Sequence, residues 1–95
     1  MKMLLVLADA ARFDAVKHDL LELGAAGYSA LPVLEGAGRT GLHAGDRVHP
    51  GGLVSVFVVA EDTKAESMFE EMVRRRNAAD DRVTRLFVLP VERQA

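Results

Sequence analysis

Two apolar runs, each followed by a helical pattern, limit the fold of this chain more than any other feature. Met3–Ala8 is continuously apolar and Leu53–Ala60 is rich in β-branched residues, as is typical of strands inside a sheet. Asp9 can cap the helix after the first run, and Thr63 with Glu66 forms a capping box after the second. The two halves of the chain therefore repeat a strand–cap–helix pattern.

Apolar residues recur at helical spacing after each run. The first stripe is Phe13, Val16, Leu20 and Leu23, and the second is Ala65, Met68, Phe69, Met72 and Val73. Gly24 and Gly27 should end the first helix. Tyr28–Glu35 and Val83–Leu89 complete the pattern as strands, and Pro90 suggests an exit or an edge position for the last one.

This order of elements predicts a single α+β domain over residues 1–95, a ferredoxin-like βαββαβ sandwich. Because β-α-β crossovers are right-handed, both helices should cover the same face of a four-stranded antiparallel sheet. The strands carry too many apolar residues for the other face to lie in water. We therefore expect the chain to self-associate.

Composition excludes several functions. With 12 basic and 14 acidic residues the net charge is −2, which gives no general attraction to nucleic acid. The RNA-binding version of this fold needs aromatic side chains on its two central strands, where Phe57 stands alone. Cysteine is absent, which excludes disulfides and thiolate chemistry and fits a reducing cytoplasm. Met3–Ala8 is too short for a membrane span or a signal peptide, so we expect a cytoplasmic protein without membrane insertion.

No catalytic set of residues is recognisable. The sequence places no Ser-His-Asp or Cys-His combination, and no paired carboxylates follow the predicted strands where a cleft would form. Asp80-Asp81 is typical of a solvated turn. We expect the protein not to be an enzyme.

A glycine-rich segment, Gly36–Gly52, separates the two halves of the chain. Within it, Glu35–Gly41 reads Glu-Gly-Ala-Gly-Arg-Thr-Gly. Alternating glycines can turn backbone N–H groups toward an anion, and Arg39 adds a planar cation with paired donors. A flexible hairpin connection is the alternative, and these residues alone leave both open. Having few large apolar side chains, the segment 36–52 should be mobile, and Arg39–Gly52 should be the most mobile part of the protein without ligand.

Two further groups of residues have a possible chemical role. His43, Asp46 and His49 recur every three residues in the glycine-rich segment, so they could bind a divalent metal if the segment curls, or could simply be polar. Arg74–Arg76 could bind phosphate, but their place late in a helix is already explained by the helix dipole.

Three segments resemble the PII signal-transduction family and its PII-like relatives. Leu23–Tyr28 resembles the junction of the family's first helix and second strand. Gly36–Thr40 resembles the Gly-aromatic-Gly-Arg-Gln segment that opens the family's T-loop, and Leu86–Arg93 resembles its last core strand.

The resemblance implies a homotrimer whose sheets face inward, with an adenine nucleotide (ATP, ADP or AMP) as a small anionic ligand in the clefts between subunits. It implies ligand contacts from Gly36, Gly38, Arg39 and Thr40 at the base of the T-loop. Arg85 matches a phosphate-contacting lysine of the family. The protein would then be a non-catalytic regulator that signals to an unidentified protein through the loop 39–52.

The chain also departs from the family. Its T-loop is shorter than in the nitrogen regulators and has no tyrosine, so uridylylation is not implied. The family's Gly-rich B-loop is replaced by Asn77–Arg82, in which no glycine can form an amide nest. The carboxylates of Asp80 and Asp81 should repel phosphate.

Other functions stay open at this point. One is a divalent-metal-binding trimer similar to the copper-tolerance relatives of the fold, with His43, Asp46 and His49 as ligands. The others are a purely structural oligomer and an ACT-like amino-acid sensor.

Overall fold

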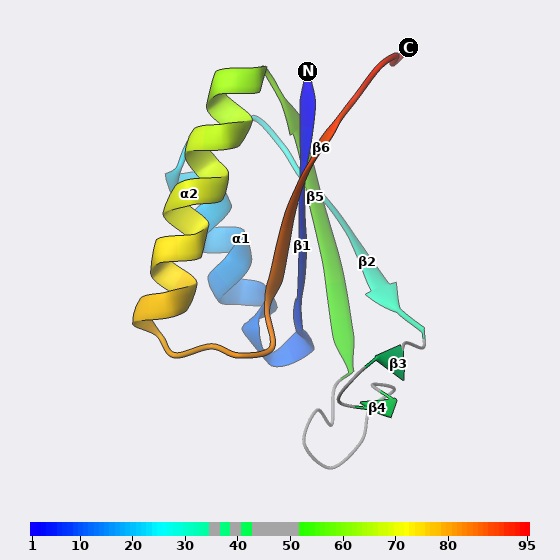
Figure 1. The fold of residues 1–95 in the computed structure, drawn as a ribbon, viewed down its shortest axis with the longest axis vertical. Helices are drawn as coiled ribbons and strands as arrows, with labels where there is room; N and C mark the ends of the chain where they lie inside the picture. The colour runs from blue at the N-terminus through cyan, green and yellow to red at the C-terminus, as the bar shows by residue number, and fades with distance from the viewer. Residues whose placement is uncertain (35–36, 39–40, 43–51) are drawn as a thin grey trace.

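The computed structural model describes residues 1–34, 37–38, 41–42 and 52–95. In these ranges the strands are β1 (Lys2–Asp9), β2 (Ser29–Val33), β3 (Ala37–Gly38), β4 (Gly41–Leu42), β5 (Leu53–Ala60) and β6 (Arg85–Pro90). The helices are the 3-10 turn η1 (Ala10–Arg12), α1 (Phe13–Glu22) and α2 (Asp62–Ala78). They form two layers, with the helices on one side of the sheet (Figure 1). None of these helices is long and apolar enough to cross a membrane.

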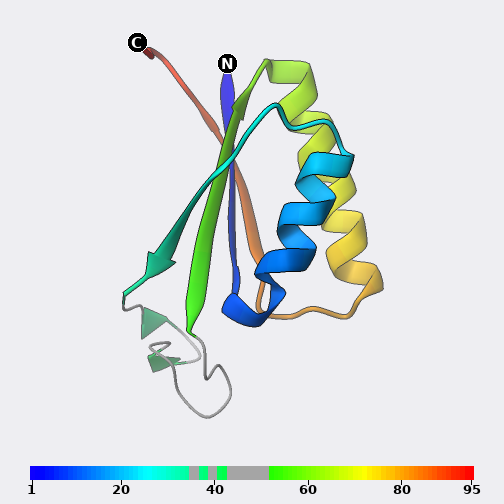
Figure 2. The same ribbon diagram turned by 180° about the vertical axis from the view of Figure 1, so that it is seen from behind.

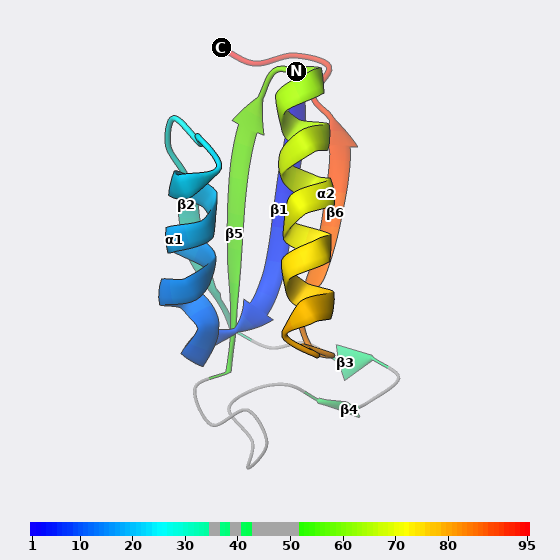
Figure 3. The same ribbon diagram turned by 90° about the vertical axis from the view of Figure 1, so that its left-hand side faces the viewer.

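The four long strands form one antiparallel sheet in the order β2-β5-β1-β6. β1 lies inside the sheet, where Val6 is opposite Val56 on one side and Leu86 on the other. α1 and α2 lie side by side over the same face of the sheet (Figure 3). The predicted ferredoxin-like α+β sandwich is therefore confirmed.

The core lies between the sheet and the helices. It consists of alternate residues of β1 and β5, whose side chains point to the helices, and of the apolar stripes of α1 and α2. Its buried members are Leu4, Val6, Ala8, Val16, Leu20, Val54, Val56, Val58, Ala65, Met68 and Met72. Most of the two predicted helical stripes is thus buried, while Phe13, Leu23 and Phe69 pack at the edge of the core.

The opposite face of the sheet carries the other alternate residues of the same strands. On this open face Leu5 lies between Phe57 and Phe87, and Met3 lies between Val59 and Leu89. Within the described ranges no helix covers it (Figure 2). Phe87 and Leu89 remain 44% and 41% exposed, so a row of large apolar side chains is left without cover in the single chain.

The strand boundaries differ in detail from those predicted. The second strand is Ser29–Val33, shorter than the predicted Tyr28–Glu35. The last strand begins at Arg85 and not at Val83, because the N–H groups of Val83 and Thr84 are donated to the Asp81 carboxylate, 3.0 Å away in each case. These two amides are therefore already bonded before the ladder begins. As Pro90 suggested, this strand lies at an edge of the sheet.

The predicted cap is present at the start of the first helix and absent at the start of the second. Asp9 accepts a hydrogen bond from the Ala11 N–H at 2.9 Å and caps the 3-10 turn that leads into α1. The capping box predicted for Thr63 and Glu66 is wrong: α2 begins at Asp62, and its N-cap Glu61 makes no side-chain cap bond. The carboxylate of Glu66 is bound instead by the Lys2 ammonium of β1 at 2.7 Å.

Candidate functional site

Most of the predicted ligand residues lie outside the described part of the chain. Gly36, Arg39 and Thr40 are among them, and their role as ligands stays a prediction. Gly38 is described through its backbone, which pairs with Gly41 in the short hairpin of β3 and β4. The glycine-rich segment thus contains two short strands that the sequence did not predict.

The predicted metal ligands His43, Asp46 and His49 also lie outside the described residues, as does most of the loop 39–52. Among the described residues, no three His, Cys, Asp or Glu side chains come together as a metal site. His18, interpreted as a surface residue, is 74% exposed and its Nε2 lies 3.3 Å from the Glu22 carboxylate.

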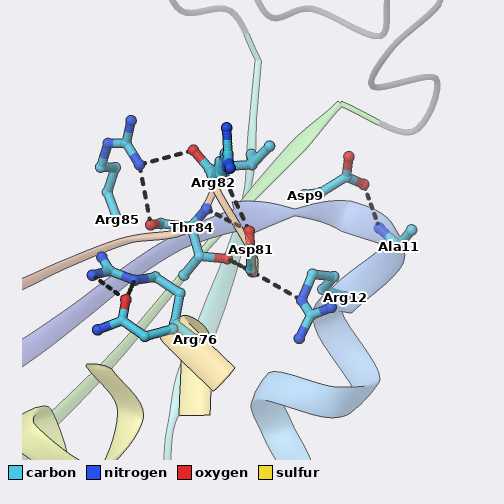
Figure 4. A network of polar contacts seen from close by, with 10 residues as sticks. Asp9, Ala11, Arg12, Arg76, Asp81, Arg82, Thr84 and Arg85 are labelled. Carbon is cyan, nitrogen blue, oxygen red and sulfur yellow. Dashed lines mark hydrogen bonds and ion pairs between the residues drawn. The ribbon is translucent and has the colours of Figure 1, made fainter. Parts of the chain in front are cut away.

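Arg85 is the one predicted ligand residue whose side chain is described. It begins β6 and lies opposite Leu7, which places it on the open face next to an apolar neighbour. Its Nη1 donates to the backbone carbonyls of Arg82 at 3.0 Å and Thr84 at 3.4 Å (Figure 4). Both acceptors are neutral, so this exposed guanidinium keeps its charge available for an anion.

An apolar cleft lies at the end of the sheet where β2 ends and β5 begins. Its volume is about 280 Å³. It is lined by Ala10, Phe13, Ala30, Leu31, Pro32, Leu53 and Val54. Phe13 also makes an edge-to-face contact with Tyr28, with 6.5 Å between the ring centroids. Because β2 and β5 flank the segment 34–52, this cleft opens beside the base of the predicted T-loop.

The turn between α2 and β6 is built around Asp81. Asp80 adopts a left-handed backbone conformation with φ of 52°, which an Asp tolerates better than most residues. The Asp81 Oδ1 accepts the N–H groups of Val83 and Thr84, and its Oδ2 accepts the Thr84 hydroxyl. The Arg12 Nε lies 3.0 Å from the same Oδ2 (Figure 4).

Asp81 is charged although it is buried. Its side chain is 6% exposed. Burial favours the neutral carboxyl, but the hydrogen bonds from Thr84 and Val83 and the positive charge of Arg12 outweigh it, so that the pKa of Asp81 is lowered. The carboxylate is thus a structural part of the turn at neutral pH.

Comparison with known proteins identifies the family. The sequence model described as nitrogen regulatory protein P-II matches residues 1–95. The chain belongs to the P-II family. No curated protein is significantly similar to it in sequence.

Solved structures share the P-II fold at low sequence identity. CPII, a nitrogen regulatory PII-like protein from Thiomonas intermedia K12 bound to ADP, AMP and bicarbonate, gives a TM-score of 0.71 at 17% identity, covering 93% of this chain and 88% of that chain. CPII bound to ADP and bicarbonate gives 0.71 at 18%, covering 92% and 81%. A putative PII-like signaling protein from Thermus thermophilus gives 0.66 at 14%, also covering 92% and 81%.

The turn at the place of the P-II B-loop differs from its sequence-based interpretation. Both carboxylates were expected to repel phosphate from a solvated turn. Asp80 is indeed exposed, and lies 3.4 Å from the Arg82 guanidinium. Asp81, however, is buried and paired with Arg12. It accepts hydrogen bonds from two adjacent backbone N–H groups, although the turn contains no glycine. The sequence missed this because an Asx-type turn depends on where the side chain points.

Arg75 has a role that its helix position alone did not reveal. Its guanidinium reaches from α2 to α1, with Nη1 2.7 Å from Asp19 and Nη2 2.6 Å from Glu22, while Nε lies 3.3 Å from Glu71. The hydrogen bond from Arg75 lowers the pKa of Glu22, and these carboxylates raise the pKa of Arg75. In this P-II chain Arg75 ties the two helices together, so it is not a free phosphate ligand.

Proposed function

We propose that this P-II family chain is a non-catalytic regulatory protein that assembles as a trimer and binds an adenine nucleotide between subunits. The observation that carries the assembly is the open face, where Leu5 lies between the partly exposed rings of Phe57 and Phe87. Fully burying a side chain of this size contributes about 1.5–3 kcal/mol. Several such residues in one row favour association of copies through their sheets.

The ligand is proposed from the chemistry at one end of the sheet. The apolar cleft of about 280 Å³ suits a flat ring such as adenine. Arg85 lies at the same end, since its partner Leu7 is also opposite Ser55, two residues from the start of β5. Because Arg85 lies on the open face of β6, at the other edge of the sheet from β2, the phosphate of a nucleotide in this cleft would be bound by the Arg85 of a neighbouring subunit. The ADP and AMP bound to CPII support the same ligand class.

The remaining contacts and the output are part of the proposal. Gly36, Gly38, Arg39 and Thr40 would bind the phosphates with Arg85. Ligand binding would order the loop 39–52 and so present it to a regulated protein.

Calorimetric titration of the parent and two variants with ATP, ADP, AMP and cyclic AMP tests this function. Arg39→Ala should weaken nucleotide binding by about 1.5–3 kcal/mol, the range for a charge-assisted hydrogen bond. His43→Ala is the matched control from the same segment, and should bind as the parent does. The proposal fails if no nucleotide binds, or if Arg39→Ala binds like the parent while His43→Ala abolishes binding of a divalent metal.

A further inference from the structure

The 3-10 turn η1 joins β1 to α1 and is held in place by groups outside it. Within and next to the turn, the Phe13 N–H donates to the Ala10 carbonyl, and Asp9 accepts the Ala11 N–H at 2.9 Å. Hydrogen bonds in a 3-10 turn are poorly aligned, and fixing a single helical turn is entropically costly. The position of η1 therefore depends on its contacts with distant parts of the chain.

The first of these contacts is with the start of β5. The Ala10 N–H donates to the Gly52 carbonyl at 2.9 Å. Gly52 is buried and has a φ of 74°, a left-handed conformation that favours glycine. It is followed directly by Leu53, the first residue of β5. The hydrogen bond from Ala10 therefore fixes the point at which the chain enters β5.

The second contact is with the turn between α2 and β6. The Arg12 Nε lies 3.0 Å from the Asp81 Oδ2 (Figure 4). The same carboxylate accepts the N–H groups of Val83 and Thr84, so it also determines where β6 begins. Asp81 is 6% exposed, and removing the partner of a buried charge leaves that charge uncompensated. The turn and η1 are thus joined by a contact that the turn cannot lose at low cost.

We propose that Arg12 is a positioning residue, which couples the turn between α2 and β6 to Gly52 through η1. When the pair of Arg12 and Asp81 is broken, η1 loses one of its supports, and the hydrogen bond from Ala10 to Gly52 opens more often. By thermodynamic linkage, opening at Gly52 weakens the pair of Arg12 and Asp81 by the same free energy.

The regulatory meaning of this coupling rests on the proposed function. Arg85, the proposed phosphate ligand, directly follows the turn, and Gly52 is the last residue of the loop 39–52. A shift of the turn on nucleotide binding would then reach the loop through Arg12. The coupling itself involves no ligand, so it can be measured on the protein alone.

Amide hydrogen exchange of the full chain without nucleotide tests the coupling. Asp81→Asn removes the charge that Arg12 binds, while its side-chain oxygen can still accept the backbone amides of the turn. Arg12→Gln removes the other partner. In each variant the Ala10 amide should exchange at least fivefold faster relative to the Val6 amide of β1, the lower end of typical coupling between two sites. The Val6 amide corrects for a loss of global stability, which would speed both amides alike.

Arg82→Gln is the matched control, because Arg82 is an exposed arginine of the same turn, 3.4 Å from the exposed Asp80. It should exchange like the parent. A double variant of Arg12→Gln and Asp81→Asn should exchange no faster than the faster single variant, since both changes remove the same contact.

The proposal is overturned if both single variants keep the parent's rate for the Ala10 amide relative to Val6. It is also overturned if Arg82→Gln speeds this amide as much as they do, or if the two single effects multiply in the double variant. Because no nucleotide is added, this test and the calorimetric titration of the proposed function can fail independently.

Discussion

The two faces of β1 are similarly apolar in sequence and very different in burial. Leu4 and Val6 are fully buried beneath the helices, whereas Leu5 and Leu7 on the other face are only half-buried. The helix-covered face is completed by the chain itself. The open face is not covered by any element in the described part of the chain. We propose that another copy of the chain covers it. An apolar run therefore predicts that both faces of a strand will be buried. It does not predict whether the chain itself or another copy covers each face.

The largest expected effect is on the helix-covered face. Leu4 is fully buried, so Leu4→Ala leaves a cavity that its neighbours fill only in part, and should lower the free energy of unfolding by about 2–5 kcal/mol. Urea unfolding at two protein concentrations measures this loss, which should be the same at both. Leu5→Ala is the matched change on the open face. Its effect should shrink as the protein is diluted, because the part that acts through assembly disappears once both proteins have dissociated. Equal and concentration-independent losses would contradict the distinction between the faces.

A charge on the open face should break assembly without unfolding the chain. Leu5→Asp places a carboxylate between Phe57 and Phe87, where each large apolar side chain contributes about 1.5–3 kcal/mol when it is fully buried. Sedimentation at micromolar concentration should show trimers for the parent and monomers for this variant, with helical circular dichroism retained. Ser67→Asp adds the same charge to an exposed position of α2 and should remain trimeric. A Leu5→Asp variant that sediments like the parent would remove the open face from the proposed interface.

Much of the fold follows from sequence patterns. The repeat of an apolar run and a helical stripe predicted the layers, and Val16, Leu20, Met68 and Met72 are buried as their spacing requires. The start of β6 was missed because a side chain, Asp81, takes two backbone amides away from the ladder. This competition between a side chain and the strand ladder depends on the rotamer of one residue, and it leaves no periodic pattern in the sequence.

The candidate site was predicted less completely than the fold. Arg85 was selected because it matches a phosphate-contacting lysine of the family, and it is the first residue of β6. The apolar cleft brings together η1, β2 and β5, and the Arg75 cluster joins α1 to α2. Contacts of this kind depend on how the helices and strands pack against one another, and no local sequence motif predicts them. The predicted loop ligands stay a prediction, because most of them lie outside the described residues.

The smallest expected effect concerns the polar end of the helix-covered face, where a charge is buried only because it is paired. Asp81→Asn removes the charge that binds Arg12 and the acceptor of the Thr84 hydroxyl, and should cost about 1–3 kcal/mol at neutral pH. The pKa of Asp81 is lowered in the folded state. The contribution is therefore complete above the ordinary Asp pKa of about 3.9 and is lost as the pH falls through the lower folded-state value. Urea unfolding of both proteins should show a stability difference that is constant above about pH 5 and narrows below about pH 4.

Asp80→Asn, which alters an exposed carboxylate 3.4 Å from Arg82, should differ little from the parent throughout. A difference between the parent and Asp81→Asn that does not narrow in acid would mean that the buried carboxylate does not stabilise the turn through its charge.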